Sequence, residues 1–184
     1  MFIQLLERIA LGLEERQIPY MIIGGQAVLI YGEPRLTRDI DVTLGVGPER
    51  LTDLLGLAEA SAWRVLVEAP TEFVQRTMVL PCLDPASSIR IDFIFSVSEY
   101  EQQAMGRVRR IGIGKADVRF AAAEDVIVHK IVAGRPRDLE DVRSILLKNP
   151  GLDREYIRHW LSEFDRSLAQ SNLQTFEDLA HAAP

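Results

Sequence analysis

The chain has 184 residues but only one cysteine and three histidines. Cys82 by itself cannot form an internal disulfide, and so little cysteine is typical of a protein of the reducing cytoplasm. The histidines show no metal-ligand spacing, so they do not indicate a metal site.

Long hydrophobic runs are also missing. No apolar run is long enough to cross a membrane, so we expect no membrane partner. Charged residues are spread among the apolar residues of positions 2–16, which favours an amphipathic helix over a secretory signal. Together with the cysteine count, this pattern predicts a cytoplasmic location.

Positive charge is in deficit as well. The formal net charge of −6 argues against a general nucleic-acid coat protein. The contents of 47% apolar and 26% charged residues are ordinary for a globular protein. A chain of this length forms one domain, or one domain with a helical appendage.

Strand-like and helix-like patterns alternate through most of the chain, and helical patterns fill the remainder. They predict an α/β (α+β) fold, with a mixed-sheet core over residues 1–120 and a helical C-terminal region, packed on the core, over residues 121–184. Strands are expected over 20–23, 37–44, 64–67, 73–80, 89–95, 108–113 and 116–120. Helices are expected over 2–16, 26–31, 48–60, 96–103, 123–133, 138–148, 153–170 and 176–181.

Two glycines and two aspartates form the most informative pattern of the sequence. Gly24 and Gly25 follow the apolar strand at 20–23 and precede a short helix. Glycine lets the backbone approach a phosphate closely, and a helix N-terminus presents free N–H groups to an anion. Asp39 and Asp41 lie at alternate positions of the next strand, so both carboxylates point to the same side.

Two carboxylates held side by side repel each other unless a cation lies between them. Mg²⁺ takes oxygen ligands from one or two carboxylates together with substrate phosphates, so Asp39 and Asp41 are candidate metal ligands, with Mn²⁺ as the alternative ion. Each half of the pattern also has a simpler explanation, because Gly-Gly is often only a tight turn and Asp-Ile-Asp only a strand end with solvated acids. Their combination, with an apolar strand before each half, favours a metal–phosphate site.

The Gly24-Gly25 pair, followed at this spacing by Asp39-Ile40-Asp41-Val42, resembles the signature of the nucleotidyltransferase superfamily with the polymerase-beta-like fold. Segment 24–42 resembles its small bacterial branch, which includes abortive-infection type (AbiEii-like) toxins of toxin–antitoxin pairs. The family often has Gly-Ser in the first motif, so Gly25 leaves backbone N–H groups to contact a phosphate. The resemblance implies Mg²⁺, a nucleoside triphosphate and an antitoxin protein as partners.

A third acid, Asp92, is embedded in the otherwise apolar strand at 89–95. A buried carboxylate is costly unless it is paired or bound to a metal. Arg90, two positions away on the same face, offers an ion pair as the structural explanation. Beside Asp39 and Asp41 the metal explanation is the better one, because a third acid would complete a two-metal cluster and help to deprotonate an acceptor hydroxyl. The family's third catalytic carboxylate is found on such a strand.

A second block joins two predicted helices. Lys130 lies among apolar neighbours, from which its flexible stem can carry a point charge to a phosphate. The resemblance implies that Lys130 contacts the triphosphate and that Asp138 orients Lys130 or another site residue. Ordinary surface charges on an exposed helix–turn–helix are the alternative. Arg38, immediately before Asp39, is placed to reach a phosphate.

The predicted hairpin at 108–120 is locally basic. This stretch could steer an RNA or the acidic face of a partner, although a solvated hairpin is the simpler explanation. The basic residues of this hairpin and of the position before it are Arg107, Arg109, Arg110, Lys115 and Arg119, with Asp117 against them.

The sequence thus predicts transfer of a nucleoside monophosphate from a nucleoside triphosphate to an acceptor hydroxyl, with release of pyrophosphate. The acceptor class, whether tRNA, a protein or a small molecule, stays open, and so does a toxin role. The alternatives are a non-catalytic nucleotide- or partner-binding module on the same scaffold, or a small-molecule nucleotidyltransferase of the antibiotic-modifying kind. The predicted catalytic and metal-binding residues are Asp39, Asp41 and Asp92; the predicted nucleotide-binding residues are Gly24, Gly25, Arg38, Lys130 and Asp138.

Overall fold

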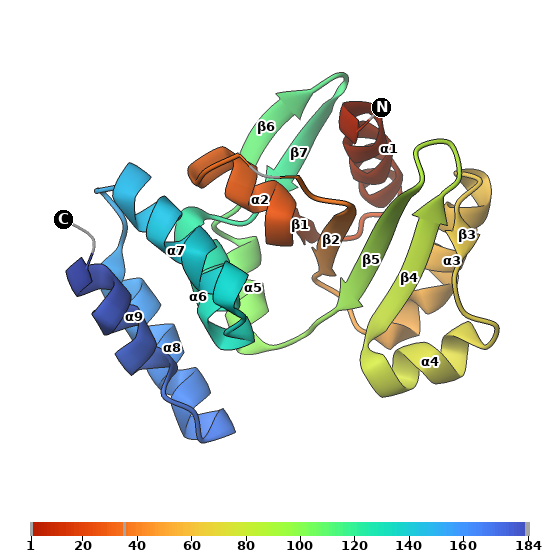
Figure 1. Cartoon of the computed structure of the whole chain (residues 1–184). Coiled ribbons are helices and arrows are strands. Elements are labelled where there is room, and N and C mark those ends of the chain that lie inside the picture. Colours follow the sequence, from red (N-terminus) through yellow and green to blue (C-terminus); the bar gives the residue numbers. More distant parts are fainter. Residues whose placement is uncertain (1, 35, 183–184) are drawn as a thin grey trace. The chain divides into compact units, whose positions relative to one another are not determined.

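The computed structural model of the chain describes residues 2–34 and 36–182 (Figure 1). Within them, one mixed sheet of seven strands has the order β3-β4-β5-β2-β1-β7-β6. Strand β1 is parallel to β7 and β2 is parallel to β5, whereas the other neighbouring pairs are antiparallel. The strands are β1 (Tyr20–Ile22), β2 (Asp39–Leu44), β3 (Arg64–Val65), β4 (Val79–Asp84), β5 (Ile89–Phe95), β6 (Arg109–Ile113) and β7 (Ala116–Phe120).

Helices precede, separate and follow these strands, which confirms the predicted α/β class with its helical C-terminal region. The helices are α1 (Phe2–Glu15), α2 (Gly24–Tyr31), the 3-10 helix η1 (Pro48–Arg50), α3 (Leu51–Ala60), α4 (Pro70–Thr77), α5 (Glu99–Met105), α6 (Ala123–Ala133), α7 (Pro136–Lys148), α8 (Arg154–Leu168) and α9 (Asn172–Ala182).

The chain divides into two compact units. The sheet unit consists of Met1–Ile23 and Thr37–Ala121 and contains the strands given above. The helical unit consists of Gly24–Leu36 and Ala122–Pro184, and it contains α2 together with α6 to α9. Helix α2 thus belongs to the helical unit although β1 and β2 flank it in the sequence. The division into 1–120 and 121–184 stays a prediction.

Alternating apolar and polar residues give strand β5 one buried face. Ile89, Ile91, Phe93 and Phe95 are all buried, whereas Arg90 between them is exposed. Strand β2 follows the same rule over its first residues, where polar and apolar positions alternate. Because side chains of a strand point alternately to the two sides of the sheet, the polar positions of both strands share one face.

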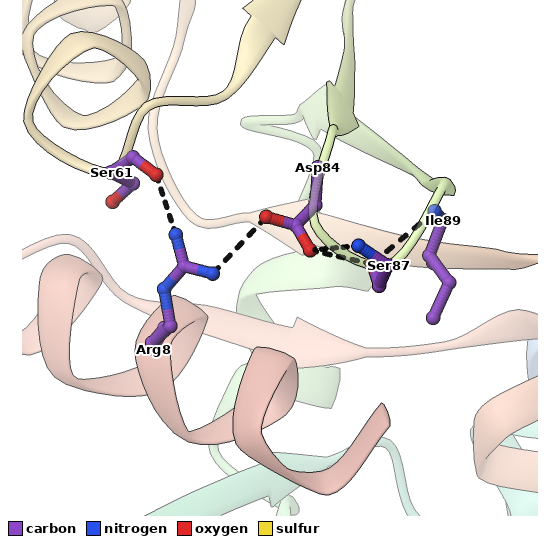
Figure 2. Close-up of polar contacts among 5 residues, drawn as sticks. All are labelled: Arg8, Ser61, Asp84, Ser87 and Ile89. Carbon is purple, nitrogen blue, oxygen red and sulfur yellow. Dashed lines mark hydrogen bonds and ion pairs between the residues drawn. The ribbon is translucent and has the colours of Figure 1, made fainter. Parts of the chain in front are cut away.

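Arg8 of helix α1 joins three parts of the sheet unit, as Figure 2 shows. One guanidinium nitrogen donates to Asp84 Oδ1 at 3.1 Å, and another donates to the carbonyl of Ser61, where α3 ends. The same guanidinium lies 5.5 Å from the ring centroid of Trp63. Asp84 also accepts from the Ser87 N–H and hydroxyl, at 3.0 and 2.5 Å. These contacts fasten α1 to the β4–β5 turn.

In the helical unit, α2 packs against α6 and α7. Asn149 Nδ2 donates to the carbonyl of Tyr31 at 2.8 Å, and Lys148 Nζ donates to the carbonyl of Gly32 at 3.1 Å. Lys148 also forms an ion pair of 2.7 Å with Glu33. The segment that follows α2 is therefore held to the end of α7.

The predicted strand at 73–80 is wrong. Residues 70–77 form α4, and the strand β4 begins only at Val79. Pro70 occupies the first turn of α4, where its missing N–H costs nothing, and Met78 ends the helix in the left-handed conformation with a φ of 59°. Val74 is the buried residue of α4, so burial on one helical stripe, rather than on alternate residues, decides the structure.

Candidate active site

Strand β2 positions the first two carboxylates. Asp39 is exposed and Asp41 is half-buried, while Ile40 and Val42 between and after them are fully buried. The two acids therefore lie on the polar face of the strand, as their spacing predicts. The N–H of Ile23, the residue after β1, donates to the carbonyl of Asp41 at 2.9 Å, so two strands support this end of β2.

Strand β5 brings the third carboxylate beside the second. In the parallel register of β2 and β5, Asp92 is the Cα partner of Asp41 and Arg90 is the partner of Asp39. Partners in adjacent strands point to the same side of the sheet, so Asp39, Asp41, Arg90 and Asp92 share one face. We call these four side chains the carboxylate cluster. The structure thus brings together the three acids that the sequence singles out.

Arg90 is the positive member of the carboxylate cluster. Its Nε donates to Asp92 Oδ1 at 2.8 Å, so the ion pair that the sequence offers as the structural explanation of Asp92 is present. This hydrogen bond, together with the negative charges of Asp92, Asp39 and Asp41, outweighs partial burial and raises the pKa of Arg90. The guanidinium therefore acts as the internal counter-ion of three carboxylates.

The negative charge of Asp92 also affects a buried thiol, that of Cys82. Cys82 lies in β4, beside β5, and is fully buried. Burial, and secondarily the charge of Asp92, raises the pKa of this thiol to about 12. Cys82 is therefore a neutral packing residue at physiological pH.

The donor set of the carboxylate cluster suits Mg²⁺. No group of three or more His, Cys, Asp or Glu side chains in 2–34 and 36–182 is arranged to hold a metal ion. Mg²⁺ does not need such a cage, since it is usually bound by one or two carboxylates and completes its shell with phosphate oxygens and water. Asp41 and Asp92, at adjacent register positions, and Asp39 on the same face are oxygen donors of this kind.

Gly24 and Gly25 begin α2, in the helical unit. Gly24 has a φ of +63°, a left-handed conformation that favours glycine over any residue with a Cβ. The first N–H groups of a helix have no partner within the helix, so the start of α2 offers backbone donors of the kind an anion requires.

Lys130 and Asp138 also lie in the helical unit, where they form a buried ion-pair cluster. Lys130 is 5% exposed, and its Nζ lies 2.6 Å from Asp138 Oδ1 and 2.9 Å from Asp141 Oδ2. Asp138 Oδ2 accepts from Arg135 Nε at 2.5 Å. Burial raises the pKa of Asp138, but the hydrogen bonds from Arg135 and Lys130 outweigh it and lower that pKa. Two carboxylates therefore neutralise the Lys130 charge.

The turn between α6 and α7 creates this ion-pair cluster. Gly134 ends α6 with a φ of +63°, as the predicted helix at 123–133 requires, and Pro136 starts α7 two residues before the predicted start at 138. Asp138 and Asp141, three residues apart, then face back toward Lys130. The role of Asp141 as a second partner of Lys130 was not expected, although its helical spacing from Asp138 was the signal for it.

The remaining predicted residue, Arg38, is exposed immediately before β2. Arg35 lies outside the described residues. None of the helices in the described ranges is long and apolar enough to serve as a membrane span.

This fold is the fold of nucleotidyltransferases. The solution structure of the antibiotic-resistance factor ANT(2'')-Ia matches with a TM-score of 0.63 and 19% identity, over 91% of this chain and 92% of that one. An antigenic nucleotidyltransferase-like protein from Paracoccidioides brasiliensis matches with a TM-score of 0.59 and 15% identity, over 98% and 92%. JHP933 from Helicobacter pylori matches with a TM-score of 0.52 and 15% identity, over 96% of this chain and 86% of that one.

The family is defined by sequence as well. Residues 1–181 match the model of a family described as nucleotidyltransferases of unknown function (DUF6036), so the chain belongs to that family. A comparison with curated proteins finds no match. The resemblance drawn from Gly24-Gly25 and Asp39-Ile40-Asp41 is therefore confirmed at the level of nucleotidyltransferases.

Proposed function

We propose that the protein is a Mg²⁺-dependent nucleotidyltransferase that moves a nucleoside monophosphate from a nucleoside triphosphate to an acceptor hydroxyl. The observation that carries this proposal is the register of β2 and β5, which sets Asp41 beside Asp92 and Asp39 on the same polar face. In a chain of a nucleotidyltransferase family, carboxylates on adjacent strands are candidate oxygen donors for a divalent ion that completes its shell with phosphate and water.

In this mechanism Asp39 and Asp41 would hold Mg²⁺, or Mn²⁺ as the alternative ion, where the triphosphate binds. A bound ion supplies neutralisation of phosphate charge and a lower pKa for the acceptor hydroxyl. Asp92 accepts the proton of that hydroxyl as its oxygen attacks the α-phosphorus and pyrophosphate leaves. Arg90 donates to Asp92 in this structure, so Asp92 exchanges that partner when it acts.

The remaining nucleotide contacts are proposed on the resemblance alone. Backbone N–H groups at Gly24 and Gly25, and the side chains of Arg38 and Lys130, would bind the phosphates. Asp138 would orient Lys130, from which it lies 2.6 Å. If Lys130 moves toward a phosphate, Asp138 keeps Arg135 as its partner. The Arg135 Nε already donates a hydrogen bond to Asp138.

A small-molecule acceptor has the strongest support. The crystal structure of ANT(2'')-Ia in complex with adenylyl-2''-tobramycin matches with a TM-score of 0.62 and 20% identity, over 91% of this chain and 98% of that one. A chain of similar extent thus binds an adenylylated small molecule on this fold. A tRNA or protein acceptor, and a toxin role with an antitoxin protein as in the AbiEii-like branch, are the competing proposals.

The test is transfer of radioactivity from α-labelled nucleoside triphosphates in the presence of Mg²⁺. Acceptors are a panel of aminoglycosides, total RNA and a protein extract, and the enzymes are the wild type, Asp41→Asn and the control Asp178→Asn. Asp178 is an exposed residue of α9, so the control removes the same charge elsewhere. We expect label from the wild type and the control, and a loss of at least about 10²-fold in Asp41→Asn.

Each label pattern decides between the proposals. Label in an aminoglycoside supports the small-molecule acceptor, whereas label in RNA or protein supports the toxin-like alternatives. Full activity of Asp41→Asn would contradict the assigned site. Mg²⁺-dependent nucleotide binding without any transfer would favour the non-catalytic binding module.

A further inference from the structure

A pocket of about 700 Å³ lies beside the hairpin of β6 and β7 in the sheet unit. Its walls come from the end of α1, from the residues that precede β1, and from the hairpin itself. No member of the carboxylate cluster lines it. Its charged lining residues are Glu14, Arg110, Lys115, Asp117 and Arg119. This pocket, the hairpin pocket, is therefore a second candidate binding site.

Two arginines at paired positions of β6 and β7 line the hairpin pocket. Arg110 of β6 and Arg119 of β7 are Cα partners in the antiparallel register, so their side chains leave the same face of the hairpin. Like charges at directly opposite positions of two strands destabilise the pair. The hairpin therefore keeps an arrangement that costs stability unless an anion lies between the two guanidinium groups.

The groups already present neutralise this pair only in part. Glu14 Oε1 lies 3.8 Å from Arg119 Nη2, at the long end of ion-pair distances. The Arg119 guanidinium also lies 5.5 Å from the ring centroid of Tyr20, and its Nε is buried without a hydrogen-bond partner among the residues described. Arg110 is exposed. Two carboxylates, Glu14 and Asp117, thus share the pocket with three basic side chains, Arg110, Lys115 and Arg119.

The hairpin pocket has room for a ligand and a rigid frame. A Cβ added at Gly112 would meet only the Asp117 carboxylate, at 3.9 Å, so the strand leaves open space at that position. The turn beyond it is fixed, because the Lys115 N–H donates to Glu7 Oε1 of α1 at 2.7 Å. The hairpin is thereby held to α1.

We propose that the hairpin pocket binds a phosphate group between Arg110 and Arg119. Guanidinium groups match phosphate oxygens with paired, charge-assisted hydrogen bonds. With three basic and two acidic lining side chains the pocket is positive, in a chain whose formal net charge is −6. The volume exceeds what one phosphate fills, so the phosphate belongs to a larger ligand, either a phosphorylated small molecule or a nucleic-acid backbone.

The test is titration of the protein with pyrophosphate in the presence of EDTA. Calorimetry measures the affinity, and thermal melting measures the change in melting temperature. Omitting metal and repeating each titration in an Asp41→Asn background removes any contribution of the carboxylate cluster. Arg110→Gln should weaken binding about tenfold, and Glu14→Gln should tighten it a few-fold because it removes a competing anion. Arg64→Gln is the matched control, since Arg64 is an exposed residue of β3 at the opposite edge of the sheet.

Thermal melting without phosphate adds a signature that a purely structural arginine would not give. Arg110→Gln should raise the melting temperature by about 1–3 °C, because it removes a like-charge pair, and should abolish the rise that pyrophosphate causes in the wild type. A labelled single-stranded oligonucleotide that displaces pyrophosphate identifies a nucleic-acid backbone as the source of the phosphate. Failure to displace it identifies a small phosphorylated ligand. Absent pyrophosphate binding, or equal weakening in Arg64→Gln, would overturn the proposal.

Discussion

At the scale of single residues, Arg90 decides how the carboxylate cluster behaves before any ligand arrives. Its hydrogen bond to Asp92 and its place opposite Asp39 give three like charges a positive neighbour. A positive side chain in this position also competes with a divalent ion for the same oxygen atoms. If the carboxylate cluster binds a divalent ion as proposed, Arg90 should therefore lower its affinity for that ion.

The first prediction concerns Arg90→Gln. We expect this variant to bind Mn²⁺ about two- to fivefold more tightly than the wild type, because an exposed ion pair contributes at most about 1 kcal/mol. Mn²⁺ titration followed by electron paramagnetic resonance measures the affinity, and Arg64→Gln controls for the lost charge. Equal or weaker binding in Arg90→Gln would show that Arg90 does not compete with the metal.

At the scale of elements, two helix glycines differ in the space around them because α1 packs closely on α3. They are Gly12 of α1 and Gly56 of α3. A Cβ added at Gly12 would come within 2.3 Å of Leu57 Cδ1, and Leu57 is 2% exposed. A Cβ added at Gly56 of α3 would meet nothing within 4 Å. The packing of α1 on α3 therefore requires glycine at position 12, whereas glycine at position 56 only lowers the stability of its helix relative to alanine.

Opposite effects on stability are expected for the two alanine variants. Gly12→Ala should lower the free energy of unfolding by about 1–3 kcal/mol, because Leu57 must leave a packed position. Gly56→Ala should raise it by about 0.5–1 kcal/mol through helix propensity. Urea denaturation followed by circular dichroism measures both, and effects of the same sign would contradict this packing of α1 and α3.

Elements with strong local signals could be predicted from the sequence, and pairings between distant elements could not. The bounds of β5 and α6 agree with prediction because the apolar residues of each segment recur regularly, and Gly134 is a clear breaker at the end of α6. The segment at 73–80 failed because one stripe of burial on α4 competes with apparent strand periodicity. That Asp41 lies beside Asp92 depends on the pairing of β2 with β5, and nothing local in either strand encodes that partner.

At the scale of the whole molecule, both compact units depend on carboxylates that are ionised and paired. Asp84 in the sheet unit is buried, which raises its pKa, but hydrogen bonds from Ser87 and Arg8 outweigh burial and lower it. Asp138 in the helical unit has a lowered pKa for the reasons given above. A lowered pKa in the folded state means that protonation favours the unfolded chain.

The stability of the protein should therefore fall in acid. The contribution of these carboxylates is complete above the unfolded pKa of about 4 and is lost as the pH falls through their lower folded values. Guanidinium denaturation between pH 5.5 and 2.5 measures this loss. Asp84→Asn should be less stable at pH 5.5 but show a shallower decline, and a decline as steep as that of the wild type would exclude Asp84 as a source.

The path of the chain between the compact units restricts how this protein can be cut or grafted. The chain passes from one unit to the other at 23–24, 36–37 and 121–122. A fragment that ends at residue 121 keeps α2 but loses α6 and α7, against which α2 packs, and a fragment that starts at residue 122 lacks α2. A single junction therefore cannot yield two self-sufficient pieces, so a chimaera that exchanges the helical unit must also exchange residues 24–36.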